Sequence, residues 1–162
     1  ALLYAADRAH HVETLIRPAL ERGEIVITDR YLDSSIAYQG AGRVLSPGEI
    51  GRISRWATES LIPTLTIIID LPAEIGLSRL KSRDRLESES TTFHERVRQE
   101  FLSLALLDPE RYLVVDGREN IEDINKVIVT RVSELRDLNK IEKKPKIKKK
   151  IIKKPTLRKK SK

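Results

Sequence analysis

The run LTIIID, residues 65–70, is short, apolar on both faces, rich in β-branched side chains, and ends on an acid. Two other segments have the same character: EIVIT at 24–28 and RYLVV at 111–115. Such runs are typical of central strands that are buried on both faces of a parallel sheet. The three segments therefore predict strands of one sheet.

Helical patterns separate these predicted strands. Ser46-Pro47-x-Glu49 has the residue types of a helix start, and Pro72 is placed to open another helix. The predicted helices cover residues 2–22, 47–61, 72–82, 90–107 and 121–137. Alternating helices and buried strands predict an α/β fold, a doubly wound parallel sheet with right-handed crossovers and helices on both faces. Trp56 and Phe101 are expected in its core.

Length and composition limit the class of protein. The 162 residues suit one domain, and the absence of cysteine excludes disulfides, thiolate zinc sites and cysteine nucleophiles. The apolar runs are much shorter than the roughly 18 residues that indicate a membrane span. We therefore expect a cytoplasmic protein that does not enter a membrane.

Charge is divided unevenly along the chain. Residues 140–162 contain 13 Lys or Arg and one acid, whereas the preceding residues contain 18 basic and 23 acidic side chains. We expect a folded domain over residues 1–138 and a Lys-rich, disordered tail over 139–162. The tail is either a solvated segment or an element that makes weak, salt-dependent contact with nucleic acid.

Polar residues follow each predicted strand. They are Asp29-Arg30, Asp70 and Asp116-Gly117. In open α/β sheets, ligands bind beyond the carboxyl ends of the strands, so these residues predict a ligand cleft. Arg30, together with Arg8 on the first helix, offers the planar guanidinium geometry that suits a phosphate.

The residues after Arg30 add groups that suit a nucleotide. Ser34, Ser35, Tyr38 and Gln39 are predicted to lie in a loop, and Tyr4 lies one helical turn before Arg8. A glutamine amide both donates and accepts, as the edge of a pyrimidine requires. An arginine in either position is more often a surface ion pair, and only the combination predicts a nucleotide site.

Six segments spread over roughly residues 1 to 135 share one resemblance. They are LLYAADR, ETLIRPAL, DRYLDSSIAYQGAGR, LTIIIDLPAEIGLSR, RLESES with FHERVRQEFL, and VVDGRENIEDI. Together they resemble bacterial thymidylate kinases, and DRY…S-x-AYQG is the most specific of them. The resemblance implies a P-loop nucleoside monophosphate kinase fold. It also implies transfer of the γ-phosphoryl group of ATP to dTMP with Mg²⁺, on the route to dTTP, commonly by a homodimer.

The resemblance implies contact with dTMP for six residues. They are Tyr4, Arg8, Arg30, Ser35, Tyr38 and Gln39. Tyr4 stands where the family usually has a phenylalanine that stacks on thymine. Arg8 corresponds to the arginine that reaches the thymine carbonyl edge, and Arg30 to the one that holds the phosphate. Tyr38 corresponds to an aromatic residue near the deoxyribose. Ser35 and Gln39 face N3 and O4. Asp29 corresponds to a catalytic carboxylate near the acceptor phosphate and Mg²⁺, which it reaches through water.

Residues from about 79 to 90 correspond to the lid that covers ATP in these kinases. Arg83 and Arg85 are the predicted catalytic cations, which stabilise charge on the phosphoryl group during transfer. Arg79 is expected near the adenine side and Glu87 on the substrate side. The alternative interpretation for either of these two arginines is that it belongs to a charged helix end exposed to solvent and has no catalytic role.

One family feature is missing from the sequence. The phosphate-binding loop G-x-x-x-x-G-K-[ST] occurs nowhere in the 162 residues, and neither does R-E-P-G-G-T. Both precede this region in the family, and the chain starts within a helical pattern. We expect that the sequence begins after the first strand and the phosphate loop, and that the chain alone is inactive. The alternative is a kinase-derived protein that binds nucleotides without catalysis.

Overall fold

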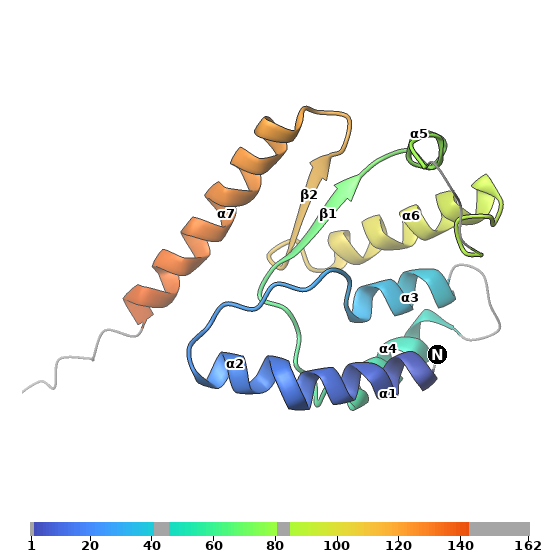
Figure 1. Cartoon of the computed structure of the whole chain (residues 1–162). Coiled ribbons are helices and arrows are strands. Elements are labelled where there is room, and N and C mark those ends of the chain that lie inside the picture. Colours follow the sequence, from blue (N-terminus) through green and yellow to red (C-terminus); the bar gives the residue numbers. More distant parts are fainter. Residues whose placement is uncertain (1, 41–45, 81–84, 143–162) are drawn as a thin grey trace, which may run out of the picture.

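The computed structural model describes residues 2–40, 46–80 and 85–142 (Figure 1). Its sheet has two parallel strands, β1 (Thr66–Asp70) and β2 (Tyr112–Asp116), in register from Thr66 opposite Tyr112 to Asp70 opposite Asp116. The strands predicted at 65–70 and 111–115 are thereby confirmed. The chain is α/β, as expected.

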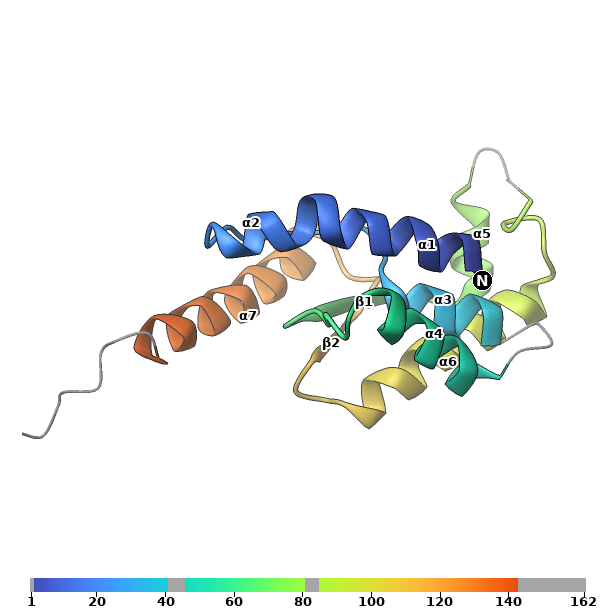
Figure 2. The same ribbon diagram turned by 90° about the horizontal axis from the view of Figure 1, so that it is seen from below.

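Helices form most of the described chain. They are α1 (Leu2–His11), η1 (Val12–Ile16), α2 (Arg17–Glu21), α3 (Leu32–Gly40), α4 (Pro47–Ala57), α5 (Ala73–Ser78), α6 (Thr91–Leu107) and α7 (Ile121–Glu142). All five predicted helices are present, although α4 and α5 end early and α7 is longer than expected. Helices α6 and α7 both contact β2 and lie on opposite sides of it (Figures 1 and 2). Within the described residues, no helix is long and apolar enough to cross a membrane.

The first three helical segments form one continuous rod (Figure 2). A π-helical turn, η1, interrupts it just before Pro18. Proline has no N–H to donate and its ring collides with the carbonyl four residues earlier, which favours a wider turn there. The rod ends at Gly23, whose φ of 78° is readily adopted only by glycine.

Helix α3 is the most buried element, and its presence corrects the prediction of a loop. Its residues Leu32 and Ile36 pack with Ile50 of α4, while Ala37 packs with Phe93 and Val97 of α6. The apolar side chains at 32, 36 and 37 recur at helical spacing, and Asp33 supplies an acid in the first turn. The serines, which favour turns as well as helix starts, had suggested a loop.

The strand predicted at 24–28 is absent. The segment is not part of the β1–β2 sheet, and Ile25 and Ile27 are 70% and 92% exposed. A strand is stabilised by its neighbours, and this segment has no neighbouring strand among the described residues. Strand β1 is also incompletely packed, since its Ile69 is 58% exposed.

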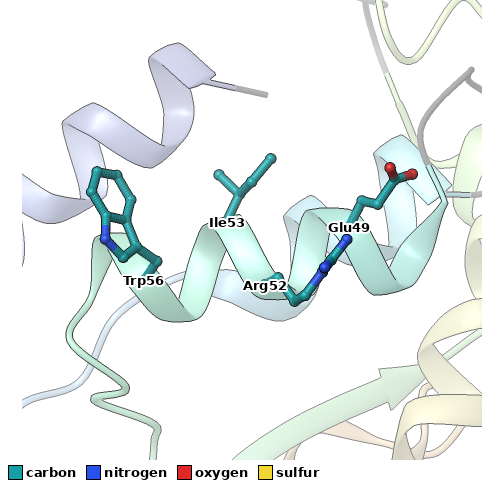
Figure 3. A pocket seen from close by; sticks show the side chains of 4 residues that line it. All are labelled: Glu49, Arg52, Ile53 and Trp56. Atoms are coloured by element: carbon teal, nitrogen blue, oxygen red, sulfur yellow. The ribbon is translucent and has the colours of Figure 1, made fainter.

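The prediction that Trp56 belongs to the core is wrong. Trp56 is 83% exposed on the outer side of α4, where it lines a shallow hollow with Ile53, Arg52 and Glu49 (Figure 3). Helix α4 buries its opposite side, with Ile50 1% exposed, against α3. Phe101 is partly buried and packs against the α3–α6 cluster, consistent with its prediction.

Candidate functional site

Arg8 of α1 connects this helix to Ser35 of α3 and to the residue just before α3 by hydrogen bonds. Its Nη2 donates to Ser35 Oγ at 2.9 Å and to the carbonyl of Tyr31 at 3.3 Å. Burial lowers the pKa of the Arg8 guanidinium from its ordinary value, although the nearby phenol of Tyr31 and the carboxylates of Asp7 and Asp33 oppose the shift. Arg8 Nη1 is buried and has no hydrogen-bond partner among the described residues.

An unpaired buried guanidinium nitrogen is costly, because it has lost its water without gaining an acceptor. The Arg8 side chain is held in place by its other nitrogen, through Ser35 and Tyr31. An acceptor atom that reached Arg8 Nη1 would remove this cost. Ser35, 8% exposed, lies at the same point.

Arg30 and Tyr38 form a second part of the site. The Arg30 guanidinium carbon lies 5.0 Å from the centre of the Tyr38 ring, within the range of a cation–π contact. The Tyr38 ring is held by Phe93 and Phe101 of α6, at 6.4 Å and 6.3 Å between ring centres. The Tyr38 ring is thus fixed, and the exposed Arg30 side chain rests on it.

Arg30 has an unusual backbone, with φ at 60°. This left-handed conformation is uncommon for a residue with a Cβ and costs about 1 kcal/mol or more. It turns the chain directly before α3 begins at Leu32. Strained residues of this kind gather at binding sites, which is consistent with the predicted role of Arg30.

Fewer contacts are described for the remaining predicted substrate residues, Tyr4 and Gln39, and for the predicted catalytic Asp29. Tyr4 is 60% exposed on α1, one turn from Arg8, and Asp29 is exposed in the segment before α3. Gln39 belongs to α3, but its side chain lies outside the described part of the structure. The structure therefore brings together Arg8 with Ser35, and Arg30 with Tyr38.

Most of the predicted lid is described. Arg79 follows the last turn of α5 and is exposed, Arg85 is exposed in a turn, and Glu87 is partly buried in the same turn. Arg83 lies outside the described residues. The structure does not bring Arg79 or Arg85 to the Arg8–Ser35 contact.

At the carboxyl ends of the strands, the acids have arginine partners. Arg98 of α6 forms a forked pair with Asp70, at 2.7 Å and 2.8 Å, and this hydrogen bonding lowers the pKa of the Asp70 carboxyl. Arg118 does the same for Asp116, whose pKa falls to about 2. Asp70 and Asp116 are register partners, so their predicted proximity is confirmed.

Between described residues, no hydrogen bond or ion pair joins Asp29 or Arg30 to these acids. The first turn of α3, which they precede, is anchored instead at the amino ends (Figure 1). The physical reason is that residues 24–28 form no strand in this sheet, so nothing carries Asp29 to its carboxyl edge.

The anchor of α3 is a buried polar cluster that sequence reasoning missed. Asp33, 4% exposed, accepts hydrogen bonds from Tyr112 Oη at 2.7 Å and from both terminal nitrogens of Arg111 at 3.3 Å. Thr66 Oγ1 lies 3.4 Å from the same carboxylate. The only sequence signal was an acid among the apolar residues of α3, together with Arg-Tyr at the start of a predicted strand.

The described residues contain no group of three or more His, Asp or Glu side chains able to hold a metal ion. Magnesium that is bound through phosphates usually needs only one or two protein carboxylates. The exposed Asp29 carboxylate is compatible with that kind of site.

Comparison with known proteins gives the family directly. The model of the thymidylate kinase family matches residues 1–128. A thymidylate kinase of Clavibacter michiganensis is 59% identical over 139 residues, which cover 83% of this chain and 66% of the relative. A thymidylate kinase of Leifsonia xyli is 59% identical over 128 residues, covering 76% of this chain and 60% of the relative.

A more distant thymidylate kinase, from Cutibacterium acnes, is 48% identical over 135 residues, again covering 83% of this chain and 66% of the relative. The chain spans about two-thirds or less of the length of the curated relatives it matches. The match includes the Arg8, Arg30, Ser35 and Tyr38 positions and both strands. On these grounds, the chain belongs to the thymidylate kinase family.

Proposed function

We propose that this chain provides the dTMP-binding part of a dTMP kinase, which transfers the γ-phosphoryl group of ATP to dTMP on the route to dTTP. Family membership supports the reaction class. The observation that carries the assignment of the site is the partly buried Arg8 side chain, whose Nη2 donates to Ser35 while its buried Nη1 has no partner among the described residues.

Arg8 and Ser35 are proposed to meet the base. The free Nη1 of Arg8 donates to a thymine carbonyl oxygen, which removes the cost of the unpaired nitrogen. The Ser35 hydroxyl, already an acceptor from Arg8, still has a proton to donate. Gln39, further along α3, is proposed to face N3 and O4, and Tyr4 to stack on the ring.

Arg30 is proposed to bind the phosphate of dTMP, and Tyr38 to lie beside the deoxyribose. Arg30 is exposed and rests on the Tyr38 ring, so a dianionic phosphate can draw its guanidinium away at little cost. Charge-assisted hydrogen bonds to phosphate are stronger than the cation–π contact that is lost. Tyr38 stays fixed by Phe93 and Phe101, which gives the sugar a rigid wall.

The groups proposed to act on the donor side are Arg79, Arg83, Arg85 and Glu87, with Arg83 and Arg85 stabilising negative charge on the transferred phosphoryl group. Asp29 is proposed to hold Mg²⁺ through water. When bound, the metal neutralises charge on the phosphate oxygens. The residues of this chain orient the acceptor, since phosphoryl transfer depends mainly on positioning and electrostatics.

Calorimetric titration of the chain with dTMP tests the site. Saturable binding is expected, and Arg8→Ala and Arg30→Ala should each weaken it by about 1.5–3 kcal/mol, the usual contribution of a hydrogen bond to a charged group. Arg52→Ala, on the outer side of α4, is the matched control and should bind as the unmodified chain does. Unchanged affinity in both site variants would refute the assignment.

Turnover is a separate question, because no G-x-x-x-x-G-K-[ST] motif is present in the sequence. The chain alone is expected to release no ADP above background in a coupled assay with ATP and dTMP. Turnover at ordinary kinase rates would show that the chain binds the donor phosphates by other means.

Three wider proposals rest on the sequence and the family. The protein acts in the cytoplasm, which the absence of cysteine suits. It forms a homodimer, for which light scattering is the direct test. The tail from residue 139 makes weak contact with nucleic acid, supported by the 13 basic residues in 140–162. DNA affinity should then fall with log salt and disappear when 139–162 are deleted.

A further inference from the structure

The Asp33 carboxylate joins parts of the chain that are distant in sequence. Tyr112 and Arg111, which both donate to it, lie 79 and 78 residues away, and Thr66 of β1 lies 33 residues away. Arg111 also reaches Thr66 Oγ1 at 3.1 Å and Asp108 Oδ2 at 3.1 Å. One carboxylate on α3 is thus tied to the starts of both strands.

Asp33 and Tyr112 are buried and Arg111 is largely shielded from water, so their hydrogen bonds matter more than those of a surface pair. The exposed fractions of the Asp33 and Arg111 side chains are 5% and 15%. The Arg111 guanidinium also lies 4.2 Å from the centre of the Tyr112 ring. Burial and the neighbouring Asp33 carboxylate both raise the pKa of the Tyr112 phenol, which keeps it a donor. A buried pair that loses one partner leaves the other group uncompensated.

Asp33 and Ser35 hold α3 on two different sides. Residues two positions apart on a helix, such as 33 and 35, are separated by about 200° of rotation around its axis, so these side chains leave the helix in nearly opposite directions. Asp33 contacts the sheet, and Ser35 contacts Arg8 of α1. A rotation or shift of α3 that breaks the first set of contacts also moves Ser35 and Tyr38.

We propose that Asp33, Arg111 and Tyr112 are positioning residues that hold α3 where Ser35 and Tyr38 meet the base and sugar of the acceptor nucleotide. This inference rests on the proposed function. None of the three residues needs to touch the ligand. Their effect on binding passes through the placement of α3 against the sheet.

The test measures dissociation constants of the full 162-residue chain for dTMP and for thymidine, which lacks the phosphate. Asp33→Asn is expected to raise both constants by the same factor, on the order of tenfold, because α3 carries the groups for base and sugar. Tyr112→Phe removes only the hydroxyl and should raise both by a smaller equal factor. Added to Asp33→Asn, it should have little further effect. Arg30→Ala should affect dTMP alone.

Asp108→Asn is the matched control. Asp108 pairs with the same arginine but belongs to the turn before β2 rather than to α3. It should lower thermal stability and leave both dissociation constants within about twofold. All titrations are made where circular dichroism shows each variant folded, and if Asp33→Asn does not fold, Tyr112→Phe carries the test.

The outcomes are distinguishable. If the unmodified chain binds neither thymidine nor dTMP, the proposed function is wrong and this inference falls with it. If the unmodified chain binds and folded Asp33→Asn and Tyr112→Phe bind equally well, only the positioning role is overturned. The same conclusion follows if Asp108→Asn weakens binding as much as Asp33→Asn, because the effect is then not specific to α3.

Discussion

The two ends of the β1–β2 ladder both carry pairs of acids and arginines, but the pairs differ in burial and reach. At the amino end, the buried Asp33 and the largely buried Arg111, with side chains 5% and 15% exposed, connect α3 to the sheet. At the carboxyl end, Arg118 pairs with Asp116 two residues away, and the exposed fractions of their side chains are 63% and 38%. Asp70 and Arg98 lie between these extremes, at 22% and 26%.

Burial decides what each pair does. Water can replace either partner of an exposed pair, so such a pair contributes little to stability. Water cannot replace a partner in a buried pair in this way. Removing one partner there leaves an unpaired buried charge, which strongly destabilises the fold. The amino end therefore fixes the position of α3, while the carboxyl end remains accessible to solvent.

The largest expected effect comes from Arg111→Ala, which leaves the Asp33 carboxylate buried without its cation. We expect a loss of about 3–5 kcal/mol in the free energy of unfolding. Urea unfolding followed by circular dichroism measures it. Arg118→Ala at the carboxyl end is the control and should leave the unfolding midpoint unchanged. Similar losses from both variants would remove the contrast between the two ends.

Gly117→Ala should cause the next largest loss of folding stability. A Cβ at this position would lie 3.0 Å from the carbonyl oxygen of Asp70 and 3.0 Å from Ile69 Cγ2. Moving backbone and packed atoms apart costs about 1–3 kcal/mol. At the carboxyl end, close backbone packing is thus more important than charge.

Gly48→Ala controls for the change from glycine to alanine. Gly48 lies in the first turn of α4 with no atom within 4 Å of the added carbon. This variant should be neutral or slightly stabilising, since alanine is the better helix former. If urea unfolding shows Gly117→Ala to be equally neutral, the strand ends are packed more loosely than the structure indicates.

The smallest effect is the acid dependence of the Asp70–Arg98 pair. Hydrogen bonds from Arg98 hold the pKa of Asp70 below its ordinary value of 3.8. The stabilisation is complete above that ordinary pKa and is lost as pH falls through the lower pKa of the folded state. Asp70→Asn should therefore cost less than about 1 kcal/mol at pH 6, and this cost should shrink as the pH falls below 3.8. A cost that grows toward low pH would contradict the pairing.

The sequence predicted the elements whose signals are local. The runs at 65–70 and 111–115 formed strands, and the helix start predicted at Ser46 begins α4. EIVIT has the same composition as those runs but pairs with no strand among the described residues, because strand formation depends on neighbours that the segment itself does not encode.

The polar contacts also divide into those that a local sequence signal predicted and those that it did not. Arg8 and Ser35 were predicted as site residues from a motif, and their contact at 2.9 Å is consistent with a common role. Asp33 and Arg111 lie 78 residues apart, and no local pattern relates them. Their pairing depends on α3 being a helix, whereas the two serines of its first turns had suggested a loop.

The most direct test of the central claim is an NMR titration of the ¹⁵N-labelled chain with dTMP. We expect saturable shifts at the amides around Arg8, Arg30, Ser35 and Tyr38, with the signals of α7 unchanged. A chain that shows no saturable shift, or whose shifts cluster on α7 or the outer side of α4, does not carry the acceptor site assigned to α1 and α3.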